Sequence, residues 1–263
     1  MPRRLFRRAS CLVIVVGWFA AHAAGAQIVN VQGQLAKAPE QDGTSGQVEA
    51  KLDWRDGNTS VIEVGVSASV LVRRGKLLGV GIVRAEYGES RDVTFSRKTF
   101  EHVRGRYTLD ERWRWEAFLQ HEYDAFRRLS VRAIAGTGPA FQIFNQKAGA
   151  LLAGAAYMVE YESLDKRSGT IDAGLRTLDH RASIYATGVQ RLGAQVSAIE
   201  TIYVQPRLDD FEDIRLLGEL AVTSKVSKHI ALTDGLTIAY DRTPPDGIQR
   251  RDVTLKIGAI VSF

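Results

Sequence analysis

The chain has 263 residues, of which 45% are hydrophobic and 25% are charged. This length fits one large domain or two small ones, and no stretch beyond residue 26 is apolar enough for a membrane helix. Of the 35 basic residues, four lie within the first eight positions, which leaves 31 against 30 acidic residues in the rest of the chain. The overall positive charge therefore gives no indication of nucleic-acid binding.

Residues 1–26 have the pattern of a secretory signal peptide. The segment MPRRLFRR is positively charged, residues 11–24 are apolar, and the small residues Ala24–Ala26 form a cleavage site. Because the apolar stretch is shorter than the roughly 20 residues that span a bilayer, we expect cleavage after Ala26 instead of a retained anchor. The sole cysteine, Cys11, leaves with the signal, so the mature chain has no disulfide or thiolate chemistry.

The mature chain divides into two parts. Residues 27–45 are polar, contain Pro39 and Gly43, and are predicted to form a short periplasmic lead. Residues 46–263 consist of segments that alternate between polar and apolar residues, without a sustained helical stripe. Such a period of two residues is typical of β-strands with one buried or lipid-facing side. We predict twelve strands, at about 46–55, 60–73, 76–88, 97–109, 112–125, 129–143, 146–161, 178–190, 193–206, 212–225, 228–242 and 249–263.

The connections between these strands differ in length. Those after the even strands, near residues 74, 110, 144, 191 and 227, are short. Those after the odd strands are mostly longer, at 89–96, 162–177, 207–211 and 243–248. Outer-membrane barrels have short periplasmic turns and longer extracellular loops. This asymmetry predicts an even strand number and places both termini in the periplasm.

The fold that we predict is an all-β, transmembrane, antiparallel up-and-down barrel in the outer membrane of a Gram-negative cell. A soluble β-barrel would show the same alternation, but the strands are long and their polar faces gather arginines and glutamates, which suits a polar lumen. The last strand ends in Phe263 and resembles the signal that such barrels offer to the barrel-assembly machinery. The expected partners are this machinery, outer-membrane lipids and lipopolysaccharide, and no nucleic acid.

Two stretches resemble a known family. Residues 46–72, GQVEAKLDWRDGNTSVIEVGVSASVLV, combine two strands with a turn at Gly57–Thr59, and residues 106–141 add aromatic and glycine-rich strands. They resemble domain of unknown function 481, whose members are often labelled salt-induced outer-membrane proteins. The resemblance implies an outer-membrane β-barrel and a link to salt or osmotic stress, and it implies no substrate.

No catalytic residue, metal site or cofactor is predicted. The mature histidines are His102, His121, His180 and His229, and only His102 is expected to face inward at mid-height. The signatures of nucleophilic and metal-dependent hydrolases do not occur. An acidic loop at residues 209–213 allows divalent-cation binding, although a solvated loop is the favoured interpretation.

The strongest constellation is a set of charged residues on one face of the fourth to sixth predicted strands. Across the predicted tight turns, even-numbered residues pair with even-numbered ones and share a face of the sheet. Glu116 should therefore lie opposite Arg104 or Arg106, and Glu122 opposite Arg132. We predict an inward ladder composed of Arg104, Arg106, Arg114, Glu116, Glu122 and Arg132.

Two interpretations of this ladder remain open: a plug of salt bridges, and a constriction that favours anions. The favoured function is a passive barrel, either a narrow porin-like pore or a structural component of the outer membrane. An outer-membrane lipid or peptide hydrolase and a surface receptor or adhesion barrel are the alternatives.

Overall fold

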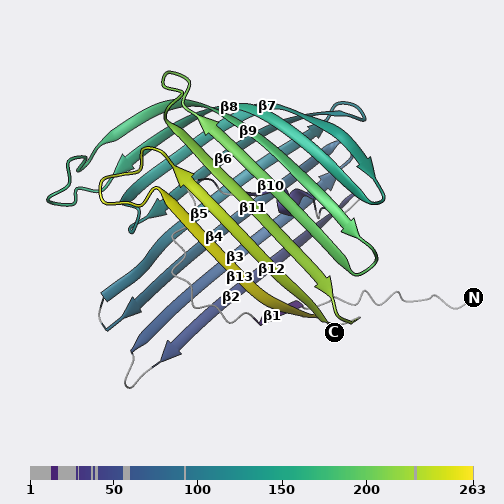
Figure 1. Cartoon of the computed structure of the whole chain (residues 1–263), viewed down its shortest axis with the longest axis horizontal. Helices are drawn as coiled ribbons and strands as arrows, with labels where there is room; N and C mark the ends of the chain where they lie inside the picture. Colours follow the sequence, from purple (N-terminus) through teal and green to yellow (C-terminus); the bar gives the residue numbers. More distant parts are fainter. Residues whose placement is uncertain are drawn as a thin grey trace, which may run out of the picture.

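The computed structural model describes residues 13–16, 28, 30–36, 38, 41–55, 60–91, 93–227 and 230–262. In these residues one antiparallel sheet of thirteen strands surrounds a short helix (Figure 1). The elements are β1 (Val13–Val16), α1 (Gln32–Leu35), β2 (Gly43–Arg55), β3 (Val61–Arg74), β4 (Leu77–Ser90), β5 (Val93–Thr108), β6 (Trp113–Asp124), β7 (Leu129–Gln146), β8 (Gly149–Leu164), β9 (Arg176–Leu192), β10 (Val196–Pro206), β11 (Ile214–Lys225), β12 (Ile230–Asp241) and β13 (Arg251–Ser262).

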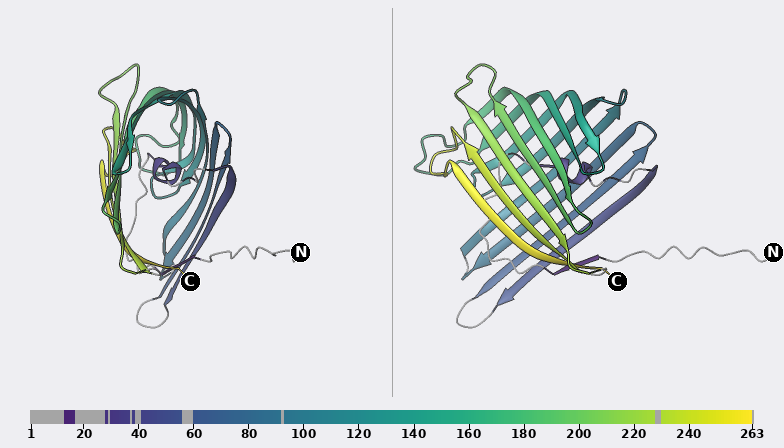
Figure 2. Two further views of the ribbon diagram at one scale, coloured as in Figure 1. Left: turned by 90° about the vertical axis from the view of Figure 1, so that its right-hand side faces the viewer. Right: turned by 45° about the vertical axis from the view of Figure 1, so that its right-hand side comes forward.

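The topology is up-and-down, because each strand from β2 to β13 is paired with its neighbours along the chain. These twelve strands confirm the all-β prediction and the predicted strand number. The sheet curves back on itself, so that α1 lies between two facing walls (Figure 2). In the described part of the chain β2 pairs with β3 alone, whereas β13 also pairs with β1 over residues 259–262. The strand β1 lies within the predicted signal peptide.

The predicted loop at 89–96 is wrong. Strand β4 continues to Ser90 and β5 begins at Val93, so the connection is a tight turn. The turn is possible because Arg91 adopts a positive φ of 48° and the strand register shifts at Gly88. The run of glycine, serine and charged residues has the composition of a loop, but cross-strand pairing holds it in the sheet. Longer connections do occupy residues 165–175, 207–213 and 242–250.

The two faces of the sheet differ in chemistry. Outward-facing apolar side chains are exposed, as shown by Leu119 at 63% and Ile202 at 60%. Inward-facing positions on the same strands hold buried charged residues, among them Glu116 and Glu122. No helix in the described residues is long and apolar enough to cross a membrane. Three sequence features, the turn at Gly57–Thr59, His229 and Phe263, lie outside the described residues.

The N-terminal segment enters the interior of the sheet. Residues 28–38, called the plug segment below, contribute the buried side chains of Ile28, Val31 and Leu35. Val31 and Leu35 pack against inward-facing Leu78, Val80 and Ile82 of β4, together with Phe100 of β5. Strand β4 therefore has apolar residues on both faces, which explains why residues 76–88 alternate poorly in the sequence.

Gly138 in β7 lies where two backbones approach closely. A Cβ atom at this position would lie 2.1 Å from the carbonyl oxygen of Ala155 and 2.5 Å from the Cα of Ala156 in β8. Neither contact can be relieved by turning a flexible side chain, so only glycine fits here. At Gly105 in β5, by contrast, an added Cβ would meet nothing within 4 Å.

We expect Gly138→Ala to lower the free energy of unfolding by about 1–3 kcal/mol, because the strands must move apart. Urea unfolding of the refolded mature protein, followed by tryptophan fluorescence, measures this cost. Gly105→Ala is the matched control and should leave the free energy nearly unchanged. Equal effects of the two substitutions would contradict the close approach.

Candidate functional site

The interior of the barrel is filled by two groups of buried charges, one toward each end of the strands. The first group lies near the turn at residues 109–112. Its centre is Glu116 of β6, which accepts hydrogen bonds from Arg104 Nη1 at 2.9 Å and from Arg106 Nε at 2.6 Å. All three side chains are buried, and the Arg104 guanidinium also lies 4.4 Å from the ring centre of Phe118. One carboxylate therefore holds two arginines of the neighbouring strand.

The plug segment joins this first group. The Arg106 Nη2 donates to Gln32 Oε1 at 2.5 Å, and Asn30 Nδ2 donates to Glu219 Oε2 of β11 at 2.8 Å. Asn30 also bonds within the segment, because its Oδ1 accepts from the backbone N–H of Gln32 at 2.8 Å. Helix α1 contacts both β4 and β10, so the plug segment bridges opposite walls.

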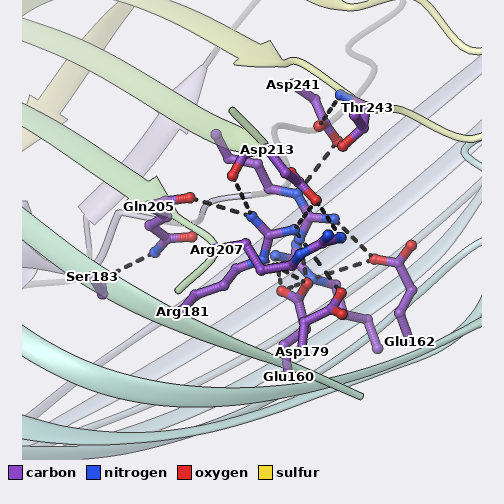
Figure 3. A network of polar contacts seen from close by, with 12 residues as sticks. Glu160, Glu162, Asp179, Arg181, Ser183, Gln205, Arg207, Asp213, Asp241 and Thr243 are labelled. Atoms are coloured by element: carbon purple, nitrogen blue, oxygen red, sulfur yellow. Dashed lines mark hydrogen bonds and ion pairs between the residues drawn. The ribbon is translucent and has the colours of Figure 1, made fainter. Parts of the chain in front are cut away.

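The second group lies at the other end of the strands, next to the long connections. Its centre is Glu160 of β8, which is 0% exposed and contacts three arginines (Figure 3). Arg132 Nη2 lies 2.5 Å from Glu160 Oε2, while Arg215 Nη1 and Arg181 Nε lie 2.5 Å and 3.4 Å from Glu160 Oε1. A buried carboxylate needs such partners, since an unpaired charge in the interior is strongly destabilising.

Further acidic groups complete this second network. Asp213 Oδ2 lies 3.0 Å from Arg181 Nη2, and Asp241 Oδ2 lies 3.4 Å from Arg215 Nε. Arg215 Nη2 also lies 3.3 Å from Glu162 Oε2. Strands β7, β8, β9, β11 and β12 all contribute, so the network ties together half of the barrel wall from inside.

The predicted ladder is distributed over the two groups. The register places Arg106 opposite Glu116, and Glu122 opposite Arg132. Arg104 and Arg106 bind Glu116, whereas Arg132 Nη1 lies 3.5 Å from Glu122 Oε2. Arg114 is apart from these pairs and donates to the carbonyl oxygen of Arg112 at 3.2 Å.

The residues that sequence reasoning missed change the charge of the lumen. The predicted ladder has four arginines and two glutamates, a positive excess. The structure adds two arginines and four acidic residues, and because Arg114 lies apart, the ion pairs join five arginines to six carboxylates. The added residues are Glu160, Glu162, Arg181, Asp213, Arg215 and Asp241. Charged residues at inward-facing positions of the later strands were the available signal, but the pairing of Arg215 in β11 with Glu160 and Glu162 in β8 joins non-neighbouring strands and was not visible.

A third set of contacts, the loop clasp, ties three connections together around Arg128. This residue is 1% exposed and adopts a positive φ of 62°. Its Nε donates to Asp165 Oδ1 at 3.0 Å, and its guanidinium also binds Asp172, Thr170 and the carbonyl oxygen of Asp246. The clasp therefore joins the β6–β7, β8–β9 and β12–β13 connections at one end of the barrel.

The loop clasp stabilises the folded protein at neutral pH, where Asp172 is ionised. Burial acts to raise the pKa of Asp172, but hydrogen bonds from the Asp246 backbone and Arg128 outweigh it and hold the pKa below its ordinary value of 3.8. A lowered carboxyl pKa stabilises the folded state above that ordinary value, and the contribution is lost as the pH falls through the lowered pKa.

The buried histidine and the acidic loop singled out from the sequence both contact neighbouring side chains. His102 is buried, its Nδ1 lies 3.2 Å from Gln120 Oε1, and its ring stacks with Phe100 and Phe118. In the acidic loop, Arg207 binds Asp209, Asp210 and Asp213 at 2.8–3.3 Å. Across the described residues, no group of three His, Cys, Asp or Glu side chains has an arrangement that could hold a metal ion.

We expect Glu160→Gln to destabilise the protein by about 3–5 kcal/mol, because three buried arginines lose their shared charge partner. The matched control is Glu63→Gln, which removes an ion pair to Lys51, a side chain that is 37% exposed. That change should cost less than about 1 kcal/mol. Urea unfolding compares the two variants, and similar costs would show that the Glu160 network does not hold the barrel together.

We expect Arg128→Ala to release the β8–β9 connection, which contains the trypsin sites Lys166 and Arg167. Limited trypsin digestion of the folded protein at neutral pH should then cut this connection faster than in the wild type. Lys147→Ala, in the exposed turn between β7 and β8, is the control and should leave the rate unchanged. An unchanged rate for Arg128→Ala would show that other contacts hold the connection.

Comparison with known proteins gives one family. The model of the family described as "Protein of unknown function, DUF481" matches residues 48–263. A search of the curated proteins finds no match.

Several solved structures are similar to the chain at low sequence identity. The NanC porin is 7% identical with a TM-score of 0.45, covering 83% of this chain and 97% of that one. The translocator domain of the autotransporter NalP from Neisseria meningitidis is 9% identical with a TM-score of 0.44, covering 89% and 93%. The KdgM porin in complex with disordered oligogalacturonate is 7% identical with a TM-score of 0.38, covering 78% and 96%. Because the family model spans most of the chain, the protein belongs to the DUF481 family.

Proposed function

We propose that the protein is a passive outer-membrane β-barrel whose lumen is closed by the plug segment and the buried ion pairs. The observation that carries this proposal is the pairing of charge inside the barrel, where five arginines lie against six carboxylates and leave no positive excess. An anion-favouring constriction needs an excess of positive charge, whereas a plug needs balanced and mutually bonded groups.

The outward face supports a place in a membrane. Trp113 and Tyr123 of β6 both face outward and are ten residues apart. A strand rises about 3.3 Å per residue, and at a tilt of about 40° ten residues cross roughly 25 Å. This is the height of the apolar band between the aromatic girdles of outer-membrane barrels. Exposed Val103 and Leu119 lie between these levels.

The orientation follows from the lengths of the connections. Outer-membrane barrels place short turns in the periplasm, so both termini and the turns such as 109–112 are periplasmic in this proposal. The loop clasp then faces the cell exterior, where lipopolysaccharide is the neighbouring lipid. The barrel-assembly machinery is the expected partner during insertion.

A closed barrel suits the salt-stress role that the family resemblance implies, because it adds to the outer membrane without admitting ions. The hydrolase alternative has less support, since the inward-facing His102 bonds to an amide oxygen and not to a carboxylate. The receptor alternative has no large loop insertion to support it.

We expect the refolded mature protein, residues 27–263, to show no steady conductance in a planar bilayer at neutral pH. The double variant Val31→Asp plus Leu35→Asp places charges against the apolar wall of β4, so it should expel the plug segment and raise conductance. The control is Ala36→Asp, at an exposed position of the same segment, which should stay closed.

Steady anion-selective conductance of the wild type would overturn the closed-barrel proposal. If Arg104→Glu plus Arg106→Glu then weakened that selectivity, the protein would be an open pore lined by the predicted ladder.

A further inference from the structure

We propose that Arg106 and the two tyrosines beside it form a carboxylate-binding site, in which the amide of Gln32 stands where the carboxylate of a small solute binds. The inference rests on the closed lumen of the proposed function and goes further, because it names the chemistry that displaces the plug segment.

The plug segment has few polar bonds to the barrel wall. Gln32 receives one bond from Arg106 and Asn30 gives one to Glu219. Most other contacts of the described residues in this segment are made by apolar side chains, including Ile28 and Val31. Neighbouring strands, by contrast, are joined along their whole length by backbone ladders. The plug segment is therefore the element of the lumen that can leave without breaking the sheet.

The surroundings of Gln32 are rich in hydrogen-bond donors. Tyr185 of β9 and Tyr203 of β10 are buried, with ring centres 5.3 Å apart, and both belong to the apolar cluster that holds Ile28. The Tyr203 hydroxyl lies near Gln32, and that of Tyr185 lies near Arg106 and Glu116, but within the described residues neither makes a hydrogen bond of ordinary geometry. An acceptor in place of the Gln32 amide can therefore improve the bonding of two buried donors.

The charge of this group also favours an anion. Glu116 is shared by Arg104 and Arg106, so the two arginines carry one positive charge more than their common partner. Besides its bond to Glu116, Arg106 donates a hydrogen bond to the neutral amide oxygen of Gln32 in this structure. A carboxylate oxygen at the same point makes a stronger, charge-assisted bond to the guanidinium. The site therefore prefers a carboxylate to the amide that fills it.

The test measures exposure of the plug segment in the folded mature protein in detergent. Cys11 is the only natural cysteine and lies in the predicted signal peptide, so Val31→Cys introduces a single reactive thiol at a position that is 0% exposed. The rate of maleimide labelling then reports how often the plug segment leaves the lumen. Ala36→Cys, at an exposed position of the same segment, gives the rate for a freely reactive thiol.

Sodium acetate should raise the labelling rate of Val31→Cys by about tenfold, because it competes with Gln32 for Arg106. Acetamide matches the end of the Gln32 side chain and carries no charge, so it should leave the labelling rate unchanged. Sodium chloride at equal ionic strength should also leave it unchanged. An equal effect of chloride or acetamide, or no effect of acetate, would overturn the proposal.

Two further variants keep the test decisive. Gln32→Glu, made in the Val31→Cys protein, attaches the carboxylate to the plug segment itself. The rate of maleimide labelling should then fall by about tenfold. Arg106→Gln should abolish the acetate effect. Faster labelling of Gln32→Glu, or an acetate effect that persists without Arg106, would count against the site. If the wild type is closed in the bilayer but acetate has no effect, the carboxylate site fails while the closed-barrel function stands.

Discussion

The structure depends on one buried carboxylate, Glu160, that binds three arginines from three other strands. A charge without water must find its partners within the protein, and here the partners lie on β7, β9 and β11. Because these strands are not all neighbours in the sheet, the network adds contacts across the lumen to the backbone ladders along the wall.

The plug segment meets a second constraint, the need to cover apolar side chains on the inner wall. Leu78, Val80 and Ile82 of β4 point into the barrel, where a water-filled lumen would leave them exposed. Val31 and Leu35 cover them, while Asn30 and Gln32 bond to charged groups on either side. The segment is thus matched to the wall in both its apolar and its polar contacts, and it lies in the interior beside the group centred on Glu116.

The distribution of charge shows why partners matter more than single residues. The ladder on β5 to β7 is rich in arginine and, taken alone, indicates a path for anions. Acidic residues later in the chain cancel this excess: Glu160, Glu162 and Asp241 come from strands, and Asp213 comes from the β10–β11 connection. The loop clasp follows the same principle outside the sheet, where Arg128 gathers two acidic groups of the β8–β9 connection and a backbone carbonyl of the β12–β13 connection.

The alternation of polar and apolar residues is a property of the sequence by itself. It determined the all-β fold, the twelve strands of the mature chain and the inward direction of the predicted ladder. It also determined the pairings across tight turns, because the turn fixes the register and places Glu122 opposite Arg132. It did not determine the turn at residues 91–92, where backbone pairing overrides a loop-like composition.

Only the tertiary structure decided what fills the lumen. The curvature of the sheet brings β4 opposite β10, and it brings Arg215 of β11 to Glu160 of β8. Such contacts between distant segments leave no periodic trace in the chain. Poor alternation in residues 76–88 was the one local sign of the plug segment, and it acquires this meaning only when the inner face of β4 is seen to be covered.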